Sequence, residues 1–214
     1  MAGAARALAA TLLLALAAGP AAADESPPPP LLPELFDVVD VEPGDVLNIR
    51  EAPSAKSAII GTLPPDARRI EVVGTDPTHR WGLIDAGGRA GWVSMRYLTP
   101  RAGRDPRRFP EHLVCHGTEP FWTLEFGAGG TVALETPEGT PRLYRLSWAE
   151  PSANIGLAAW GASFDDASGR ASAVIRRGLC SDGMSDRPFG LAIDWIAEDA
   201  PGRRLYSGCC SLTR

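Results

Sequence analysis

Hydrophobic and polar residues alternate through residues 36–93, and this period of two predicts short β-strands. Turn-forming residues separate the apolar runs at 42–45, 64–66, 76–77 and 85–88. The apolar positions are Val39, Val41, Val46, Leu47, Ile49, Ile59, Ile60, Leu63, Ile70, Val72, Val73, Trp81, Leu83, Ile84, Trp92 and Val93. We therefore expect the first half of the chain to form a small, closed β-barrel.

The second half also alternates, so a second all-β unit is expected, either an antiparallel barrel or a sandwich. Residues 121–126 place Trp122, Leu124 and Phe126 on one face, and the glycine-rich segment 127–130 turns the chain into 131–136 as a hairpin. The same alternation recurs at Tyr144, Leu146 and Trp148, at Phe189, Leu191, Ile193 and Trp195, and in a last short run at 204–209. No segment has a long helical period.

The N-terminus has the features of a secretory signal. Arg6 precedes an apolar run at 8–18 that is too short to span a bilayer, and small alanines at 21–23 predict cleavage after Ala23. The first cysteine is Cys115, so the cleavage site lacks the cysteine that a lipoprotein anchor needs. We expect an exported, periplasmic protein without a transmembrane segment. The proline-rich residues 24–35 are predicted to form an extended spacer.

The length of 214 residues suggests two domains, at 36–100 and 109–214, because a chain of this size can bury two small cores. Residues 101–108 carry four arginines and several breakers, and we interpret them as a basic linker. An alternative is that this linker contacts an anionic cell-wall polymer or lipid. The formal net charge of −5 argues against nucleic acid as a partner.

Several motifs in the first half resemble a bacterial SH3-like domain over residues 36–100. They are Leu47-Asn-Ile-Arg-Glu-Ala-Pro53, Ile60-Gly-Thr-Leu63, Trp81, Gly91-Trp-Val93 and Tyr97-Leu98, in that order, and the usual Ser-Gly-Pro turn of the family is Glu51-Ala-Pro53 here. The resemblance implies peptide or peptidoglycan stems as the ligand, held in an aromatic and polar groove. The candidate ligand-binding residues are Asn48, Arg50, Trp81, Trp92 and Tyr97.

All four cysteines lie in the second half, at 115, 180, 209 and 210. An even number in an exported chain predicts two disulfides. Adjacent Cys209 and Cys210 point to opposite strand faces and do not suit a bond with each other, so one pairs with Cys115 and the other with Cys180, in an order the sequence leaves open. A metal site made from these thiols and His116 would lack the usual Cys-x-x-Cys spacing, and we expect no metal.

A cysteine nucleophile at Cys115 has little support. Such a peptidase needs a base held against the thiolate, and the chain offers only His79, His112 and His116, without the local patterns of the cell-wall peptidases or transpeptidases. We expect no catalytic residue and no cofactor.

Three motifs in the second half are similar to those of an uncharacterised domain of bacterial envelope proteins, over residues 109–214. They are Cys115-His-Gly-Thr-Glu-Pro-Phe-Trp122, Cys180-Ser-Asp-Gly-Met-Ser-Asp186 and Gly208-Cys-Cys210. The resemblance implies a location in the envelope but no activity. Its motif residues of interest are Glu119, Trp122, Asp182, Asp186 and Arg187.

The two aspartates of the middle motif allow several interpretations. Asp182 and Asp186 are expected to accept backbone N–H bonds in a tight loop, or to pair with Arg187. A calcium site would lack a bidentate glutamate. Glu119 with either aspartate would give the acid and base of a hydrolase, whose separation the sequence does not supply.

Together these features predict an exported, non-enzymatic envelope protein whose SH3-like module binds peptide or peptidoglycan. One alternative is a small-molecule carrier that encloses a ligand among Trp122, Trp148, Trp160 and Trp195 of the second domain. The other is a cell-wall hydrolase with an unrecognised site. The sequence leaves the oligomeric state open.

Overall fold

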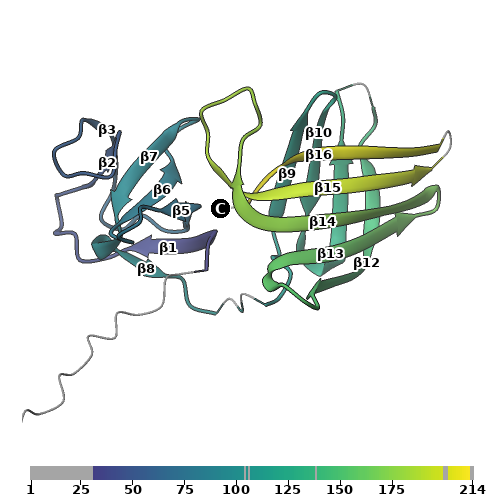
Figure 1. Ribbon diagram of the computed structural model, residues 1–214, viewed down its shortest axis with the longest axis horizontal. Helices are drawn as coiled ribbons and strands as arrows, with labels where there is room; N and C mark the ends of the chain where they lie inside the picture. The colour runs from purple at the N-terminus through teal and green to yellow at the C-terminus, as the bar shows by residue number, and fades with distance from the viewer. Residues whose placement is uncertain (1–30, 104, 106, 138, 200–201, 213–214) are drawn as a thin grey trace, which may run out of the picture.

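The computed structural model describes residues 31–212, except 104, 106, 138, 200 and 201. Two β-rich lobes lie side by side, with β1 to β8 in the first and β9 to β16 in the second (Figure 1). The predicted signal at 1–23 and most of the predicted spacer lie outside the described residues. Within the described part of the chain, no helix is long and apolar enough to cross a membrane.

The first domain consists of two small sheets around one core. Strand β1 (Glu34–Val38) pairs with β4 (Ile70–Val72) and β8 (Leu98–Pro100). The second sheet has the order β3 (Ile59–Leu63), β2 (Leu47–Arg50), β7 (Ala90–Ser94), β6 (Trp81–Asp85) and β5 (Gly74–Thr75), and a 3-10 turn, η1 (Met95–Tyr97), precedes β8. The core residues are Phe36, Val38, Leu47, Ile49, Val72, Ile84, Val93 and Leu98. The predicted strands are thus present.

The sequence predicted a small, closed barrel for the first domain. In the structure its strands form two separate hydrogen-bonded sheets, one of three strands and one of five. The N–H of Val73 donates to the carbonyl oxygen of Leu83 at 2.9 Å, so the chain leaves the sheet of β4 and joins the sheet of β6 at this residue. The fold also begins earlier than expected. Glu34 and Leu35, assigned to the spacer, lie in β1, and Leu35 is only 5% exposed.

The second domain is a closed, eight-stranded antiparallel barrel in which each strand pairs with the next, and β16 pairs with β9. Its strands are β9 (Leu113–Thr118), β10 (Phe121–Phe126), β11 (Thr131–Glu135), β12 (Arg142–Ser152), β13 (Gly156–Asp166), β14 (Gly169–Cys180), β15 (Phe189–Asp199) and β16 (Gly202–Leu212). The predicted hairpin is β10 and β11, joined by the 3-10 turn η2 (Ala128–Gly130).

Large side chains fill the barrel interior. Trp122, Trp160 and Trp195 are at most 4% exposed, and the rings of Trp122 and Trp195 meet edge to face with centroids 5.5 Å apart. Tyr206 stacks on Trp195, with centroids 4.5 Å apart. Edge-to-face and stacked pairs of this kind add to the stability gained by burial. The interior of the barrel is therefore a packed aromatic core.

One aromatic residue departs from the predicted alternation. The pairing of β12 with β13 shifts between Leu146 and Trp148, and such a β-bulge moves the following side chain to the other face. Trp148 is consequently 50% exposed on the outside of the barrel, above Gly161, where an added Cβ would lie 3.1 Å from its ring. The expectation that Trp148 shares a face with Tyr144 and Leu146 is wrong for this reason.

Candidate ligand-binding groove

A groove of about 440 Å³ on the first domain gathers four of the five residues proposed to bind ligand. Asn48 and Arg50 come from β2, Trp81 begins β6, and Tyr97 ends the turn η1. In β2 the side chains alternate, so Leu47 and Ile49 enter the core while Asn48 and Arg50 are partly exposed. The alternation that builds the core therefore also presents these two polar side chains.

Backbone hydrogen bonds fix the aromatic walls of the groove. The N–H of Trp81 donates to Oδ1 of Asp76 at 2.8 Å. The N–H of Asp76 donates to the carbonyl oxygen of Trp81 at 3.0 Å. Burial would raise the pKa of the Asp76 carboxyl, but hydrogen bonds from Thr78 and the Trp81 N–H outweigh it and hold the pKa below its usual value. The carbonyl oxygen of Tyr97 accepts the N–H of Val39 at 3.0 Å. Both rings thus rest on rigid segments.

Trp92 is not among the residues that line this groove. It is opposite Arg50 and Leu83 in the sheet and is partly buried there. Conversely, three acidic residues that were not predicted from the sequence motifs also line the groove, Asp40, Glu42 and Asp45. The segment 42–45 was interpreted only as a turn, although three carboxylates within six residues were a visible signal.

Comparison with known proteins agrees with this geometry. Residues 45–99 match the family model of the bacterial SH3 domain, so the first domain is a bacterial SH3 domain. The matched segment includes Asn48, Arg50, Trp81 and Tyr97. No curated protein and no solved structure matches the chain.

The three motifs of the second domain meet at one end of the barrel. Cys115 of β9 and Cys210 of β16 lie directly opposite each other and form a disulfide inside the barrel, where both are fully buried. Beside it, Trp122 lies over the backbone of Gly117 and Gly208, and an added Cβ at those glycines would lie 2.0 Å and 2.9 Å from the Trp122 ring. Two of the motifs thus form one packing unit.

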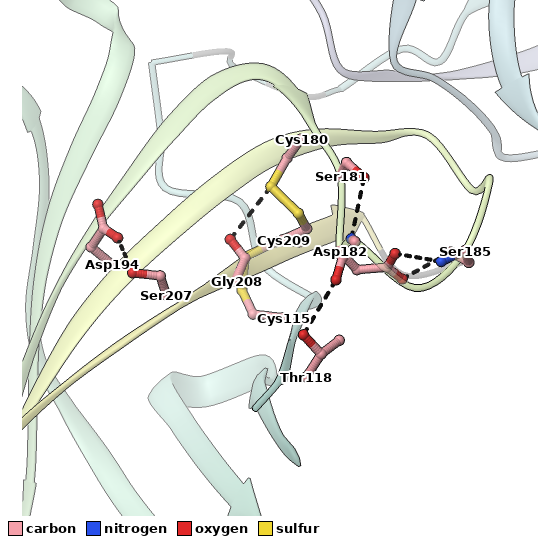
Figure 2. The surroundings of a disulfide bond; sticks show 12 residues. Cys115, Thr118, Cys180, Ser181, Asp182, Ser185, Asp194, Ser207, Gly208 and Cys209 are labelled. Carbon is pink, nitrogen blue, oxygen red and sulfur yellow. Dashed lines mark hydrogen bonds between the residues drawn. A yellow bond between two sulfur atoms is a disulfide. The ribbon is translucent and has the colours of Figure 1, made fainter. Parts of the chain in front are cut away.

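The second disulfide joins Cys180 to Cys209 on the outside of the barrel (Figure 2). It fixes the start of the loop between β14 and β15, which contains the middle motif, Cys180–Asp186. The two disulfides confirm that neighbouring Cys209 and Cys210 have separate partners. They also settle the pairing, since alternation along β16 turns Cys210 inward and Cys209 outward.

Asp182 organises this loop from within. Its carboxylate accepts the N–H groups of Met184 and Ser185 at 3.0 and 2.8 Å and the Ser185 hydroxyl at 2.8 Å, as Figure 2 shows for Ser185. Burial would raise the pKa of Asp182, but these bonds outweigh it and the pKa lies below the usual value. Its backbone carbonyl accepts the Thr118 hydroxyl at 3.2 Å. The predicted tight loop is thus formed by Asp182.

The rest of the loop contacts the SH3 domain. Asp186 forms an isolated backbone bridge with Arg89, and Arg187 Nε lies 3.3 Å from Oδ2 of Asp85. Arg187 therefore pairs with an acidic residue of the other domain and not, within the described residues, with the aspartates of its own motif. Figure 1 shows this loop between the two lobes. The middle motif thus forms part of the contact between the domains.

Further contacts join the domains along the same side. Glu71 Oε1 accepts the N–H of Leu212 at 2.9 Å, and Nη1 of Arg177 donates to the carbonyl oxygen of Pro33 at 3.0 Å. The basic linker is also anchored, because the Arg101 N–H donates to the carbonyl oxygen of Leu35 at 2.9 Å and the Arg107 carbonyl accepts Nε1 of Trp160 at 3.2 Å. These bonds hold the linker against both domains.

The other candidate chemical groups of the second domain are not gathered in the SH3 groove; His116 and Asp182 border a smaller hollow of about 280 Å³ on the barrel. Glu119 is exposed in the turn between β9 and β10. His116 is partly buried, and burial together with the nearby Arg187 charge lowers its pKa, while its Nδ1 lies 3.2 Å from the Thr123 hydroxyl. In the part of the chain that the structure describes, no three His, Cys, Asp or Glu side chains are grouped to hold a metal ion.

Proposed function

We propose that this protein is exported to the cell envelope and binds peptide or peptidoglycan stems, without catalysis, in the groove of its bacterial SH3 domain. The observation that carries the proposal is the convergence of Asn48, Arg50, Trp81 and Tyr97 on one groove within the segment that matches the family. Concave sites with aromatic walls and a few polar groups are the usual form of such binding sites.

The disulfides support export. Each of the four cysteines is in a disulfide, and such bonds persist in oxidising compartments outside the cytoplasm. A periplasmic location fits this chemistry and the predicted signal at the N-terminus.

Three observations favour binding over catalysis. Cys115 has no thiol to serve as a nucleophile, because it is bonded to Cys210. The Asp182 carboxylate is engaged by its own loop, and Glu119 is exposed in a turn and does not line the hollow that Asp182 borders. The carrier alternative is also disfavoured, because Trp122, Trp160 and Trp195 pack within the barrel and Trp148 lies outside it.

Co-sedimentation of the full oxidised protein with purified peptidoglycan sacculi tests the proposal. Asn48→Ala and Trp81→Ala should each reduce the bound fraction, with Trp81→Ala losing about tenfold in affinity because an aromatic wall is removed. Trp148→Ala removes a solvent-exposed tryptophan of the barrel that does not line the groove, and it is the control.

Folding of each variant is checked by circular dichroism. Equal binding by all variants would exclude this groove. Release of soluble fragments from the sacculi would contradict the non-enzymatic part of the proposal.

A further inference from the structure

The groove on the SH3 domain has a strongly acidic lining. Asp40, Glu42 and Asp45 contribute three carboxylates, whereas Arg50 contributes the guanidinium. The Nη1 of Arg50 donates to the carbonyl oxygen of Ser57 at 2.7 Å, which directs part of its hydrogen-bonding capacity away from a ligand. The groove therefore favours a positively charged ligand.

Two acidic groups of the groove, Asp40 and Glu42, differ from the paired aspartates Asp37 and Asp85 of the same domain, whereas Asp45 accepts the N–H of Val46 at 2.7 Å. Asp37 pairs with Arg68 at 3.2 Å and with Arg101 at 3.5 Å, and Asp85 pairs with Arg187. For Asp40 and Glu42, by contrast, no side-chain hydrogen bond or ion pair is formed with any residue that the structure describes. Their carboxylates remain available to a bound cation.

The aromatic walls add a second, independent preference. Trp81 and Tyr97 line the same groove, and the face of an aromatic ring attracts an ammonium or guanidinium group. A cation between these rings and the carboxylates would gain from both, and the attraction is stronger where water is partly excluded. Asn48, also on the groove face of β2, offers an amide to hydrogen-bond a peptide backbone.

We infer that the ligand of this groove is a peptide segment with a free amine, whose ammonium group is held by Asp40 and Glu42 and lies against Trp81 and Tyr97. This inference rests on the proposed function and specifies which part of the wall peptide is recognised. An acidic or uncharged peptide of equal length should bind more weakly.

The test compares untreated sacculi with sacculi whose free amines have been acetylated by acetic anhydride, using the full oxidised protein. Acetylation should lower the affinity about tenfold, and Asp40→Asn with Glu42→Gln should lower binding to untreated sacculi about three- to tenfold. The double variant should also bind both preparations equally. Asp66→Asn with Glu125→Gln removes two carboxylates at exposed positions outside the groove and controls for the change of two in net charge.

The possible outcomes distinguish failure of the amine inference from failure of the proposed function. If binding depends on Trp81 but is unchanged by acetylation, the amine inference is overturned and the proposed function stands. If acetylation weakens wild type and the double variant to the same degree, general charge repulsion explains the effect and the inference is also overturned. If untreated sacculi are not bound at all, both fail. The inference is supported if the wild type and the control variant bind untreated sacculi more tightly than acetylated sacculi, and the Asp40→Asn, Glu42→Gln variant does not.

Discussion

Arg187 of the barrel pairs with Asp85 of the SH3 domain, and the same guanidinium donates from Nη2 to the Ser211 hydroxyl at 3.1 Å. It also lies 4.6 Å from the centre of the Phe189 ring. The Arg187 and Asp85 side chains are 31% and 20% exposed, so the pair is shielded from much of the solvent. One side chain thus connects the terminal strand of the barrel to the end of strand β6 of the SH3 domain.

This pair should contribute measurable coupling between the domains. In a double-mutant cycle with Arg187→Ala and Asp85→Ala, we expect a coupling energy of about 1 kcal/mol in the free energy of unfolding, from urea denaturation. Arg203 and Glu198 form the control pair, because they are 79% and 48% exposed and should couple by near zero. Additive effects of the Arg187 and Asp85 substitutions would show that the pair contributes nothing.

The two disulfides should differ in their contribution to stability. The Cys115–Cys210 bond closes 95 residues and the Cys180–Cys209 bond closes 29. Loop-closure entropy predicts losses of about 4.5 and about 3.5 kcal/mol when each pair is replaced by alanine. Chemical denaturation of the two double variants measures this difference.

Loss of the outer disulfide should have a local effect as well. Limited proteolysis should cut the loop between β14 and β15 faster in the Cys180→Ala, Cys209→Ala protein than in the Cys115→Ala, Cys210→Ala protein. Equal cleavage of both would mean that the hydrogen bonds of Asp182 and the contacts with the SH3 domain hold the loop without the disulfide.

The stability of the barrel should depend on pH because of Asp166. Nε and Nη2 of Arg142 donate to its carboxylate at 2.5 and 2.9 Å, and these bonds lower the pKa of Asp166 from 3.8 to about 2. Because the folded-state pKa is lowered, the stabilisation is fully present above pH 4 and is lost as the pH falls toward 2.

Asp166→Asn should therefore destabilise the protein by about 1–2 kcal/mol near neutral pH, and by progressively less between pH 4 and pH 2. Thermal unfolding across this range measures the difference, with Asp66→Asn as the exposed control. A difference between Asp166→Asn and wild type that does not change with pH would contradict this assignment.

Gly208 should tolerate no side chain. A Cβ there would lie 2.1 Å from the carbonyl oxygen of His116, which belongs to the neighbouring strand and cannot move away without opening the barrel. Gly208→Ala should cost about 1–3 kcal/mol of unfolding free energy. At Gly74 the nearest atom would lie at 3.5 Å, an ordinary contact, so Gly74→Ala should change stability little and serves as the control.

Local patterns were sufficient to predict much of the fold. Alternation located β2, β10 and β15, because a strand with one buried face must alternate. It did not single out β13 and β14. Their inward positions include small residues such as Ala162, Ala171 and Ala173, which give a weak hydrophobic signal. The exposure of Trp148 depends on a β-bulge that no turn-forming residue in the sequence indicates.

Long-range contacts explain the remaining differences at the candidate sites. The partner of Arg187 is a residue of the other domain, far away in sequence, and no local motif encodes that contact. The groove was largely anticipated through the family motifs, which supplied Asn48, Arg50, Trp81 and Tyr97. Its acidic rim, by contrast, comes from a loop whose position against Tyr97 is set by tertiary contacts.

Leu35 has a consequence for how the halves of this protein can be separated. It is hydrogen-bonded into the SH3 sheet through β1, yet its side chain lies in the same buried cluster as the barrel residues. A barrel released by cleavage between the domains would keep an opening where this leucine was, and the SH3 domain would expose it to water. The two domains therefore cannot be treated as independent units, because Leu35 of the SH3 domain is part of the buried cluster of the barrel.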